Sequence, residues 1–265
     1  MYQFNYHRPA TLEEAVALYR GAEDGIYLAG GQTLLPTMKQ RLAAPSDVID
    51  LGRVDGLRGI DVSADRVSVG AFARHAEVAS DPRVRATLPV LAYLAGEIGD
   101  NQVRNRGTLG GSVANSDPSA DYPAAVIGLG ATIHTSERRI AADDYFQDLF
   151  ETALQPGEII TRIDFPVPTR AAYRKFPNPA SRYAVVGVLV ADFSGSIRVG
   201  ITGAGPCAFR GTAIEQALQR DLNPAALDGI EVPDAGFNSD LHASAEYRAH
   251  LVRVMAKRAV AALLA

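Results

Sequence analysis

Two double-glycine segments decide the architecture of this chain: Ala29-Gly30-Gly31-Gln32-Thr33-Leu34-Leu35-Pro36 and Arg106-Gly107-Thr108-Leu109-Gly110-Gly111-Ser112-Val113-Ala114-Asn115. The first follows an apolar run typical of a strand and leads into a helical turn at residues 33–39. Paired glycines at such a junction leave backbone N–H groups free and let an anion approach the backbone closely. Either pair alone is typical of a tight turn. Both together, flanked by hydroxyl and amide side chains, predict a site for the two phosphates of a dinucleotide.

The composition limits the class of protein. With 265 residues, 47% of them hydrophobic, and 24 glycines, the chain can bury substantial cores and is expected to form two or three modules. The net charge of -4 gives no general attraction to nucleic acid or to an acidic membrane surface. The single cysteine excludes an internal disulfide, a CxxC redox pair and a self-contained iron–sulfur cluster.

The chain shows no sign of a membrane segment. No apolar run approaches the roughly 20 residues that a membrane span requires. Residues 1–8 lack the apolar core of a signal peptide. We therefore expect a cytoplasmic protein.

Strand and helix patterns alternate along the chain, which predicts an α+β fold. Thr11 and Glu14 form a capping box for a helix that extends to Tyr19. Hairpins are predicted at residues 59–70, 131–140 and 184–203, the last turning over Ser194-Gly195. A long final helix is predicted at residues 245–264. The proline-rich stretch at residues 166–179 predicts a boundary, after which we expect a smaller three-stranded sheet with a helical cap.

A third glycine segment matches the Rossmann fingerprint G-x-G-x-x-A, at Gly203-Ala204-Gly205-Pro206-Cys207-Ala208. The strand before it is the second arm of the hairpin at residues 184–203, so the parallel βαβ crossover that the fingerprint requires is missing. We interpret this segment as a turn at a sheet edge, with Cys207 a small buried or half-buried residue.

Further segments accompany the two glycine turns in a fixed order: Phe4-Asn5-Tyr6-His7-Arg8-Pro9-Ala10-Thr11, Ile98-Gly99-Asp100-Asn101-Gln102-Val103-Arg104-Asn105, Ser116-Asp117-Pro118-Ser119-Ala120-Asp121-Tyr122-Pro123, Gly157-Glu158-Ile159-Ile160 and Ala180-Ser181-Arg182-Tyr183-Ala184-Val185-Val186. Over nearly the whole chain this order resembles the FAD-binding medium subunit of the molybdenum hydroxylases, the family of aerobic carbon monoxide dehydrogenase and bacterial xanthine dehydrogenase. The resemblance implies an FAD-binding domain at residues 1–172, built of two α+β subdomains at about 1–55 and 56–172. A C-terminal flavoprotein domain is implied at residues 173–265.

The resemblance also implies partners. The substrate is oxidised at a molybdenum cofactor on a large subunit, and electrons pass through two [2Fe–2S] clusters on a small subunit to FAD on this chain. They then leave for an external acceptor. The single cysteine agrees with this division, because the clusters must lie on another polypeptide.

The predicted FAD contacts of the two turns come from the resemblance and from the chemistry of the residues. In the first turn they are Ala29, Gly30, Gly31, Gln32, Thr33 and Leu34, whose N–H groups and Thr33 hydroxyl suit a pyrophosphate. In the second they are Thr108, Gly110, Gly111 and Ser112. Serine at position 112 is typical of the carbon monoxide dehydrogenase branch. Asn115 and Asp121 match family positions that bind ribityl or ribose hydroxyls.

Five predicted contacts have an equally simple structural interpretation. Asp121 is also a candidate helix N-cap before Tyr122-Pro123. Ile159 and Ile160 match an apolar contact to a ring of FAD, but one of them is expected to be core by periodicity. Lys175 is a candidate cation beside the flavin or a solvated surface lysine. Tyr183 either stacks near the flavin or ends a strand with its hydroxyl in water.

Arg104 and Arg106 flank the second glycine turn. They either hold this loop by local hydrogen bonds or meet an acidic partner.

No residues for proton-transfer catalysis stand out. The five histidines show no metal-ligand spacing, and no Ser-His-Asp or paired-carboxylate pattern is present. The expected function is therefore FAD-dependent electron transfer. One alternative is a stand-alone flavoprotein oxidase, which is disfavoured because such enzymes generally need a larger substrate domain and because no histidine lies in or next to either glycine turn. The other is a binding module that has lost its flavin.

Overall fold

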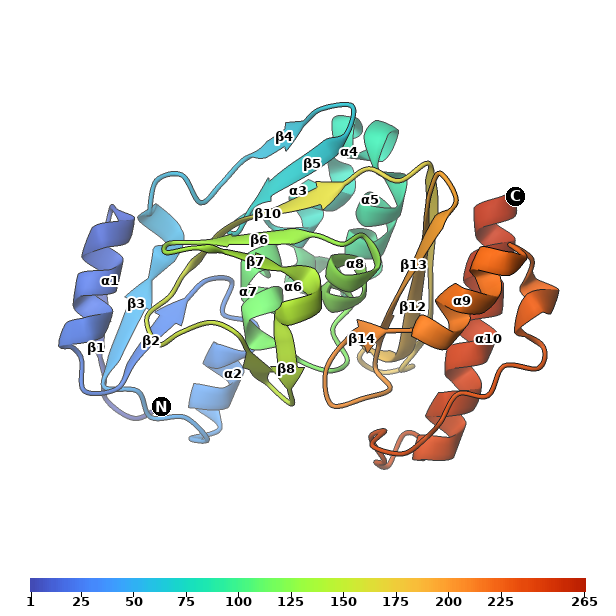
Figure 1. Ribbon diagram of the computed structural model, residues 1–265. Coiled ribbons are helices and arrows are strands. Elements are labelled where there is room, and N and C mark those ends of the chain that lie inside the picture. The colour runs from blue at the N-terminus through green and yellow to red at the C-terminus, as the bar shows by residue number, and fades with distance from the viewer.

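The computed structural model describes residues 1–265 and arranges their strands in four sheets (Figure 1). The first sheet is parallel, in the order β1-β3-β2. Its strands and flanking helices are β1 (Asn5–His7), α1 (Leu12–Gly21), β2 (Gly25–Leu28), α2 (Leu34–Lys39), β3 (Asp47–Asp50) and η1 (Leu51–Arg53). The predicted cap of α1 is confirmed, because Thr11 Oγ1 accepts from Glu14 N–H at 3.1 Å.

The second sheet is antiparallel and has the order β4-β5-β10-β6-β7. Its strands are β4 (Ile60–Val62), β5 (Arg66–Gly70), β6 (Thr132–Thr135), β7 (Arg139–Ala141) and β10 (Ile160–Pro166). Two of its strand pairs are the hairpins predicted at residues 59–70 and 131–140. A short connection before β10 contains η2 (Ala142–Asp144), β8 (Phe146–Asp148) and β9 (Glu151–Thr152).

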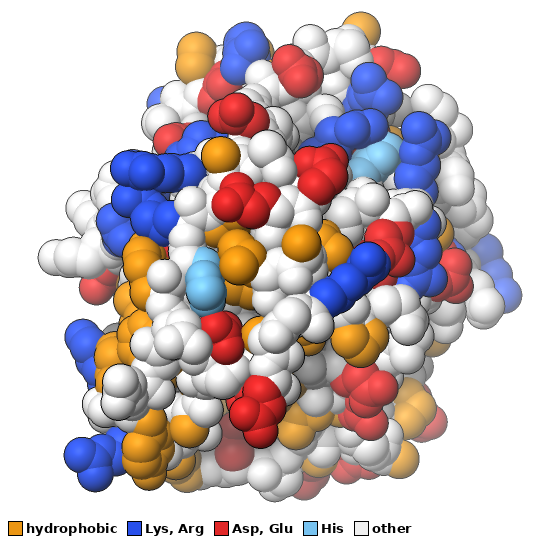
Figure 2. All heavy atoms as spheres, turned by 90° about the vertical axis from the view of Figure 1, so that its left-hand side faces the viewer, with side chains coloured by type: hydrophobic (Ala, Val, Ile, Leu, Met, Phe, Trp, Pro, Cys, Tyr) orange, Lys and Arg blue, Asp and Glu red, His pale blue; other side chains and the backbone are white.

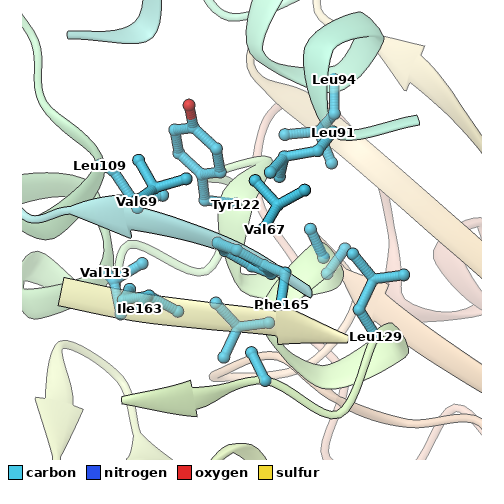
Figure 3. Packing of buried hydrophobic residues seen from close by; sticks show 14 of the residues in the cluster. Val67, Val69, Leu91, Leu94, Leu109, Val113, Tyr122, Leu129, Ile163 and Phe165 are labelled. Carbon is cyan, nitrogen blue, oxygen red and sulfur yellow. The ribbon is translucent and has the colours of Figure 1, made fainter. Parts of the chain in front are cut away.

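Between β5 and β6 the chain forms a run of short helices: α3 (His75–Ser80), α4 (Pro82–Thr87), α5 (Pro89–Gly96), α6 (Asn101–Arg104), α7 (Leu109–Asn115) and α8 (Tyr122–Gly128). Val67 and Val69 of β5 pack with Phe165 of β10, with Leu91 of α5 and with Leu109 of α7 in one buried cluster (Figure 3). Alternate residues of the strands point into this cluster, as period-two patterning requires. The cluster fixes the start of α7, where the second glycine turn lies.

The C-terminal sheet has four strands in the order β11-β12-β13-β14. They are β11 (Arg170–Pro177), β12 (Ala184–Phe193), β13 (Ser196–Thr202) and β14 (Phe209–Arg210). The prediction of three strands is corrected, because the two-residue strand β14 adds to the edge of β13. So short a pairing leaves no periodic pattern in the sequence.

Helices cover both faces of this C-terminal sheet. On one face lie α9 (Thr212–Arg220) and α10 (Ala245–Leu264), joined through η3 (Pro224–Leu227), and α8 packs on the other (Figure 1). Strand β12 is therefore buried along nearly its whole length, which explains its continuous apolar run Ala-Val-Val-Gly-Val-Leu-Val-Ala. The C-terminal module and the second sheet thus share α8.

The Rossmann-like segment is a turn, as predicted. Strand β13 pairs antiparallel with β12, and Gly203 has a φ of +86° at the end of β13. A Cβ at Gly203 would lie 2.5 Å from the carbonyl oxygen of Val185, so glycine is required here by packing as well as by backbone conformation.

The surface carries charges of both signs. On the face seen in Figure 2, basic side chains gather in two groups at the upper left and upper right, with acidic and apolar side chains between them. None of the helices combines the length and apolar character needed to cross a bilayer.

Candidate cofactor-binding site

The two glycine turns, distant in sequence, lie against each other. A Cβ placed on Gly30 would lie 2.4 Å from the Arg106 carbonyl oxygen and 2.7 Å from Gly107 Cα. Backbone thus packs directly on backbone, and any side chain at Gly30 would separate the turns. The sequence predicted two phosphate-binding turns, and the structure brings both to one place.

The first turn offers a row of unused donors. Leu35 N–H donates to Gly31 O at 3.2 Å and Thr37 N–H to Thr33 O at 3.1 Å, whereas the N–H groups of residues 30–34 donate to no protein acceptor. Gly31 has a φ of +71°, a left-handed conformation that curves the backbone and that glycine adopts without strain. Because α2 has only six residues, these N–H groups, rather than a long helix dipole, are the source of positive potential.

In the second turn, by contrast, the N–H groups already donate to acceptors within the protein. Gly110 N–H donates to Ala71 O at 2.8 Å and Leu109 N–H to Ala73 O at 3.0 Å, which fastens the turn to the segment after β5. Thr108, which the sequence predicted as a hydroxyl donor to the cofactor, is the N-cap of α7: its Oγ1 accepts from Gly111 N–H at 3.2 Å. The second turn therefore lets a ligand approach its backbone closely and offers side-chain groups to it, whereas the free N–H groups belong to the first turn.

A cavity of about 860 Å³ opens beside the two turns, within the usual size range of ligand sites. Most of the predicted contacts line it: Ala29, Gly30, Gly31, Gln32, Thr33, Leu34, Thr108, Gly110, Gly111, Ser112, Asn115, Asp121, Ile159, Ile160 and Tyr183. No lysine or arginine is among the residues that line it. The charge of a bound pyrophosphate would therefore be met by N–H and hydroxyl donors, of which the side chains of Ser112 and Asn115 have no partner within the protein.

Lys175 does not line the cavity and is not a solvated surface residue. Its side chain is 4% exposed, and its Nζ lies 2.9 Å from a carboxylate oxygen of Asp121. Asp121 occupies the N-cap position of α8 but makes no side-chain cap bond. Its carboxylate accepts instead from the Tyr173 hydroxyl at 2.6 Å. Burial raises the pKa of Asp121, while Lys175 and Tyr173 act in the opposite direction. Both alternatives based on a simple structural role, an N-cap for Asp121 and a surface position for Lys175, are corrected.

The remaining predicted contacts form the wall of the cavity. Ile159 and Ile160 are both buried, and they belong to the clusters beneath the first and second sheets respectively. Tyr183, directly before β12, is 47% exposed. Burial of part of its ring raises the pKa of its hydroxyl, as do the nearby carboxylates Asp117 and Asp121. This end of the cavity is acidic and aromatic.

Sequence reasoning missed an aromatic part of the wall. Tyr19 and Tyr27 stack with ring centroids 5.0 Å apart, and the Tyr27 hydroxyl donates to Gly157 O at 3.0 Å. Gly157 has a φ of +83°, and a Cβ there would lie 2.9 Å from the Tyr19 ring. The family motif that contains Gly157 was visible, but the facing tyrosines carried no motif of their own.

His75 was also missed. It is 4% exposed and lines the cavity, and its Nε2 lies 2.6 Å from where a Cβ on Gly107 would be. Burial and the Arg104 guanidinium lower its pKa from 6.5 to about 4. Its Nδ1 has no partner, and neither has the hydroxyl of the neighbouring Tyr122, which points away from Phe165 in Figure 3. A histidine does adjoin the second turn, in space rather than in sequence.

Arg104 and Arg106, left open by the sequence, differ in role. Arg104 donates to the carbonyl oxygens of Ile98 and Gly99, both at 2.9 Å, and so holds the loop before the turn. Arg106 is exposed and makes no ion pair. Only Arg106 is free to meet a partner.

The free N–H groups and the cavity suit the phosphates of a dinucleotide, and comparison with known proteins gives the family of this chain. Residues 2–168 match the family model for the FAD binding domain in molybdopterin dehydrogenase. The chain belongs to this family, whose cofactor is FAD, as the resemblance predicted.

Individual relatives agree over almost their full length. The chain is 36% identical to the nicotine 6-hydroxylase medium subunit of Paenarthrobacter nicotinovorans, covering 96% of this chain and 95% of the relative. It is also 36% identical to the carbon monoxide dehydrogenase medium chain of Afipia carboxidovorans, covering 97% and 95%. Among solved structures, a chain of the Cu,Mo-CO dehydrogenase in its cyanide-inactivated form superimposes with a TM-score of 0.91 at 34% identity, covering 99% of this chain and 98% of that one.

Proposed function

We propose that this chain is the FAD-bearing medium subunit of a molybdenum hydroxylase complex. In this role a large subunit with a molybdenum cofactor supplies electrons to the [2Fe–2S] clusters of a small subunit. This chain receives the electrons from those clusters and passes them to an external acceptor. The observation that carries the proposal is the unused row of N–H groups at residues 30–34, at the edge of a cavity that is lined by no lysine or arginine.

The division of labour within the cavity follows from its donors. The N–H groups of residues 30–34 and the Thr33 hydroxyl would hold the pyrophosphate, with Gly30, Gly110 and Gly111 allowing close approach. The Ser112 hydroxyl and the Asn115 amide would bind the remaining polar groups of FAD. The tyrosine stack at Tyr19 and Tyr27 supplies a flat apolar surface for a ring.

FAD, when bound, supplies the two-electron redox chemistry. The protein's own residues bind it, orient it and exclude water from it. The carboxylates Asp117 and Asp121 and the Tyr183 ring set the electrostatics of one end of the cavity.

We propose the domain division that the resemblance implied, with an FAD-binding domain at residues 1–172, in subdomains of about 1–55 and 56–172, and a C-terminal domain at 173–265. The first and second sheets fall into the two subdomains, and this supports the division. Strand β11 begins at Arg170, slightly before the proposed boundary. We also propose a cytoplasmic location.

The proposal is tested by purifying a tagged chain from its native host. Two further polypeptides are expected to copurify, one with iron and acid-labile sulfide and one with molybdenum, and the complex should absorb near ~450 nm as oxidised flavin does. A flavin-loaded monomer that is reduced by an organic substrate with no partner present would overturn the proposal in favour of a stand-alone oxidase. A pure chain that neither carries nor takes up flavin would leave the binding-module alternative.

A further inference from the structure

The loop at residues 178–183 joins β11 to β12 and carries two residues, Ser181 and Tyr183, that line the cavity. Asn178 closes it: its N–H donates to Tyr183 O at 2.8 Å, and its carbonyl accepts from Arg182 N–H at 2.9 Å. The Asn178 side-chain oxygen accepts from Ala180 N–H at 2.9 Å. Arg182 has a φ of +63°, which is unfavourable for a residue with a side chain. The loop is therefore tightly closed but strained at its tip.

Lys175 fastens this strained tip to the rest of the molecule. Its Nζ donates to Arg182 O at 2.8 Å, to Glu97 O at 2.9 Å and to the Asp121 carboxylate. An ammonium group has three N–H donors, so all three are used. One side chain thus joins the tip of the loop, the end of α5 and the start of α8.

The burial of this lysine is unusual enough to need a reason. Its side chain is 4% exposed and that of Asp121 is 3% exposed. Removing a charge pair from water is costly, and replacing such a pair by apolar residues is often neutral or stabilising. Lys175 is therefore a poor source of stability. What it supplies is a defined geometry among the segments that it joins.

We propose that Lys175 is a positioning residue that holds the loop at residues 178–183 in place at the cavity, so that Tyr183 forms part of the cavity wall before any ligand binds. This inference rests on the proposed function, because the cavity matters only if it binds FAD. The contact between Lys175 and the loop does not itself depend on FAD. Lys175 acts through Arg182 and Asp121 and does not itself touch the cofactor cavity.

The loop contains its own reporter. Arg182 is exposed, so trypsin can cut the bond between Arg182 and Tyr183 whenever the loop opens. The full-length chain without FAD is digested, and the cut after Arg182 is followed by mass spectrometry. In Lys175→Met the rate of this cut should rise by about tenfold, as expected when a charge-assisted hydrogen bond to the loop is lost. The matched control is Lys257→Met on α10, far from the loop in sequence, which should be cut at the wild-type rate.

A double variant guards against global unfolding. Lys175→Met alone leaves the Asp121 carboxylate buried without its cation, which can unfold the chain and expose every arginine together. In Lys175→Met with Asp121→Asn, no unpaired charge remains, but Arg182 O still lacks its donor. This variant should melt near the wild-type temperature and still be cut selectively after Arg182. A folded double variant that is cut at the wild-type rate overturns the proposal.

A second measurement connects the loop to flavin. Complex purified with Lys175→Met should carry flavin with several-fold weaker affinity, whereas the Lys257→Met complex should match the wild type. If the wild-type chain binds no FAD but the cut after Arg182 still depends on Lys175, the proposed function fails and the positioning role stands. If FAD binds normally and the cut does not respond to Lys175, the positioning role fails alone.

Discussion

Replacing Gly31 by alanine tests whether the first turn binds the pyrophosphate through its curved backbone. Gly31 has a φ of +71°, and a Cβ there would meet Leu35 Cδ1 at 2.8 Å. The left-handed conformation costs a residue with a side chain about 1–2 kcal/mol. If the backbone relaxes to avoid this cost, the N–H groups of residues 30–34 change their positions relative to one another.

The magnitude follows from the strain. An energy of about 1–2 kcal/mol corresponds to a factor of roughly 5–30 in an equilibrium constant, so FAD affinity in Gly31→Ala should fall by at least this factor. The assay is titration of FAD into flavin-free complex, followed by the quenching of flavin fluorescence. Thermal melting of the same samples reports the cost to folding.

Gly236→Ala is the matched control. Gly236 has a φ of +83° and has nothing within 4 Å of its added Cβ, and it does not line the cavity. It should lose similar stability and bind FAD as the wild type does. Wild-type FAD affinity in Gly31→Ala, in a protein whose melting temperature has fallen, would refute the reasoning and leave the first glycine pair as an ordinary turn.

Three further outcomes are expected. Thr108→Val removes the N-cap of α7 and should lower the free energy of unfolding by about 1 kcal/mol, which lowers the melting temperature by roughly 2–4 °C. Thr108→Ser keeps the cap and should melt as the wild type does. An unchanged melting temperature in the valine variant would show that the cap does not stabilise the protein. Because the pKa of His75 is lowered from 6.5 to about 4 in the folded state, the unfolded chain binds the proton more readily between these values, so stability should fall by roughly 3 kcal/mol as pH drops from 6.5 to 4. His75→Gln should flatten this part of the stability curve. Equal curves for His75→Gln and wild type would contradict a buried neutral His75. Arg106→Glu should reduce copurification of the partner subunits without changing flavin content, whereas full recovery of the complex would exclude Arg106 from the interface.

Local patterns were enough to predict the hairpins and the two glycine turns, because each depends on residues close together in the chain. The cap at Thr11, the turn over Ser194-Gly195 and the rejection of the Rossmann match at Gly203 all follow from such short-range chemistry. Recognition of the family added the cofactor. It did not show how the site is assembled.

The contacts that sequence reasoning missed all join distant segments. The N–H groups of Leu109 and Gly110 in the second turn donate to the carbonyl oxygens of Ala73 and Ala71, a pairing that neither segment shows by itself. His75 reaches Gly107 in the same way. Lys175 was expected at the surface or beside flavin, and its burial depends on Asp121, 54 positions earlier. Hydroxyl and lysine side chains are compatible with several environments, so their roles are fixed only by tertiary packing.

The contact between Gly30 and Arg106 has a thermodynamic consequence. The first turn belongs to the parallel three-stranded sheet and the second to the helices beside the five-stranded sheet, so a ligand held by both is a reversible cross-link between separately built parts of the chain. By linkage, binding stabilises their docking by RT ln(1 + [L]/Kd), which is about 2.7 kcal/mol when the free ligand is at a hundred times its Kd. A flavin held by both turns, as we propose, would act as a structural cross-link as well as a redox centre, and its free concentration would set how firmly the N-terminal sheet is docked.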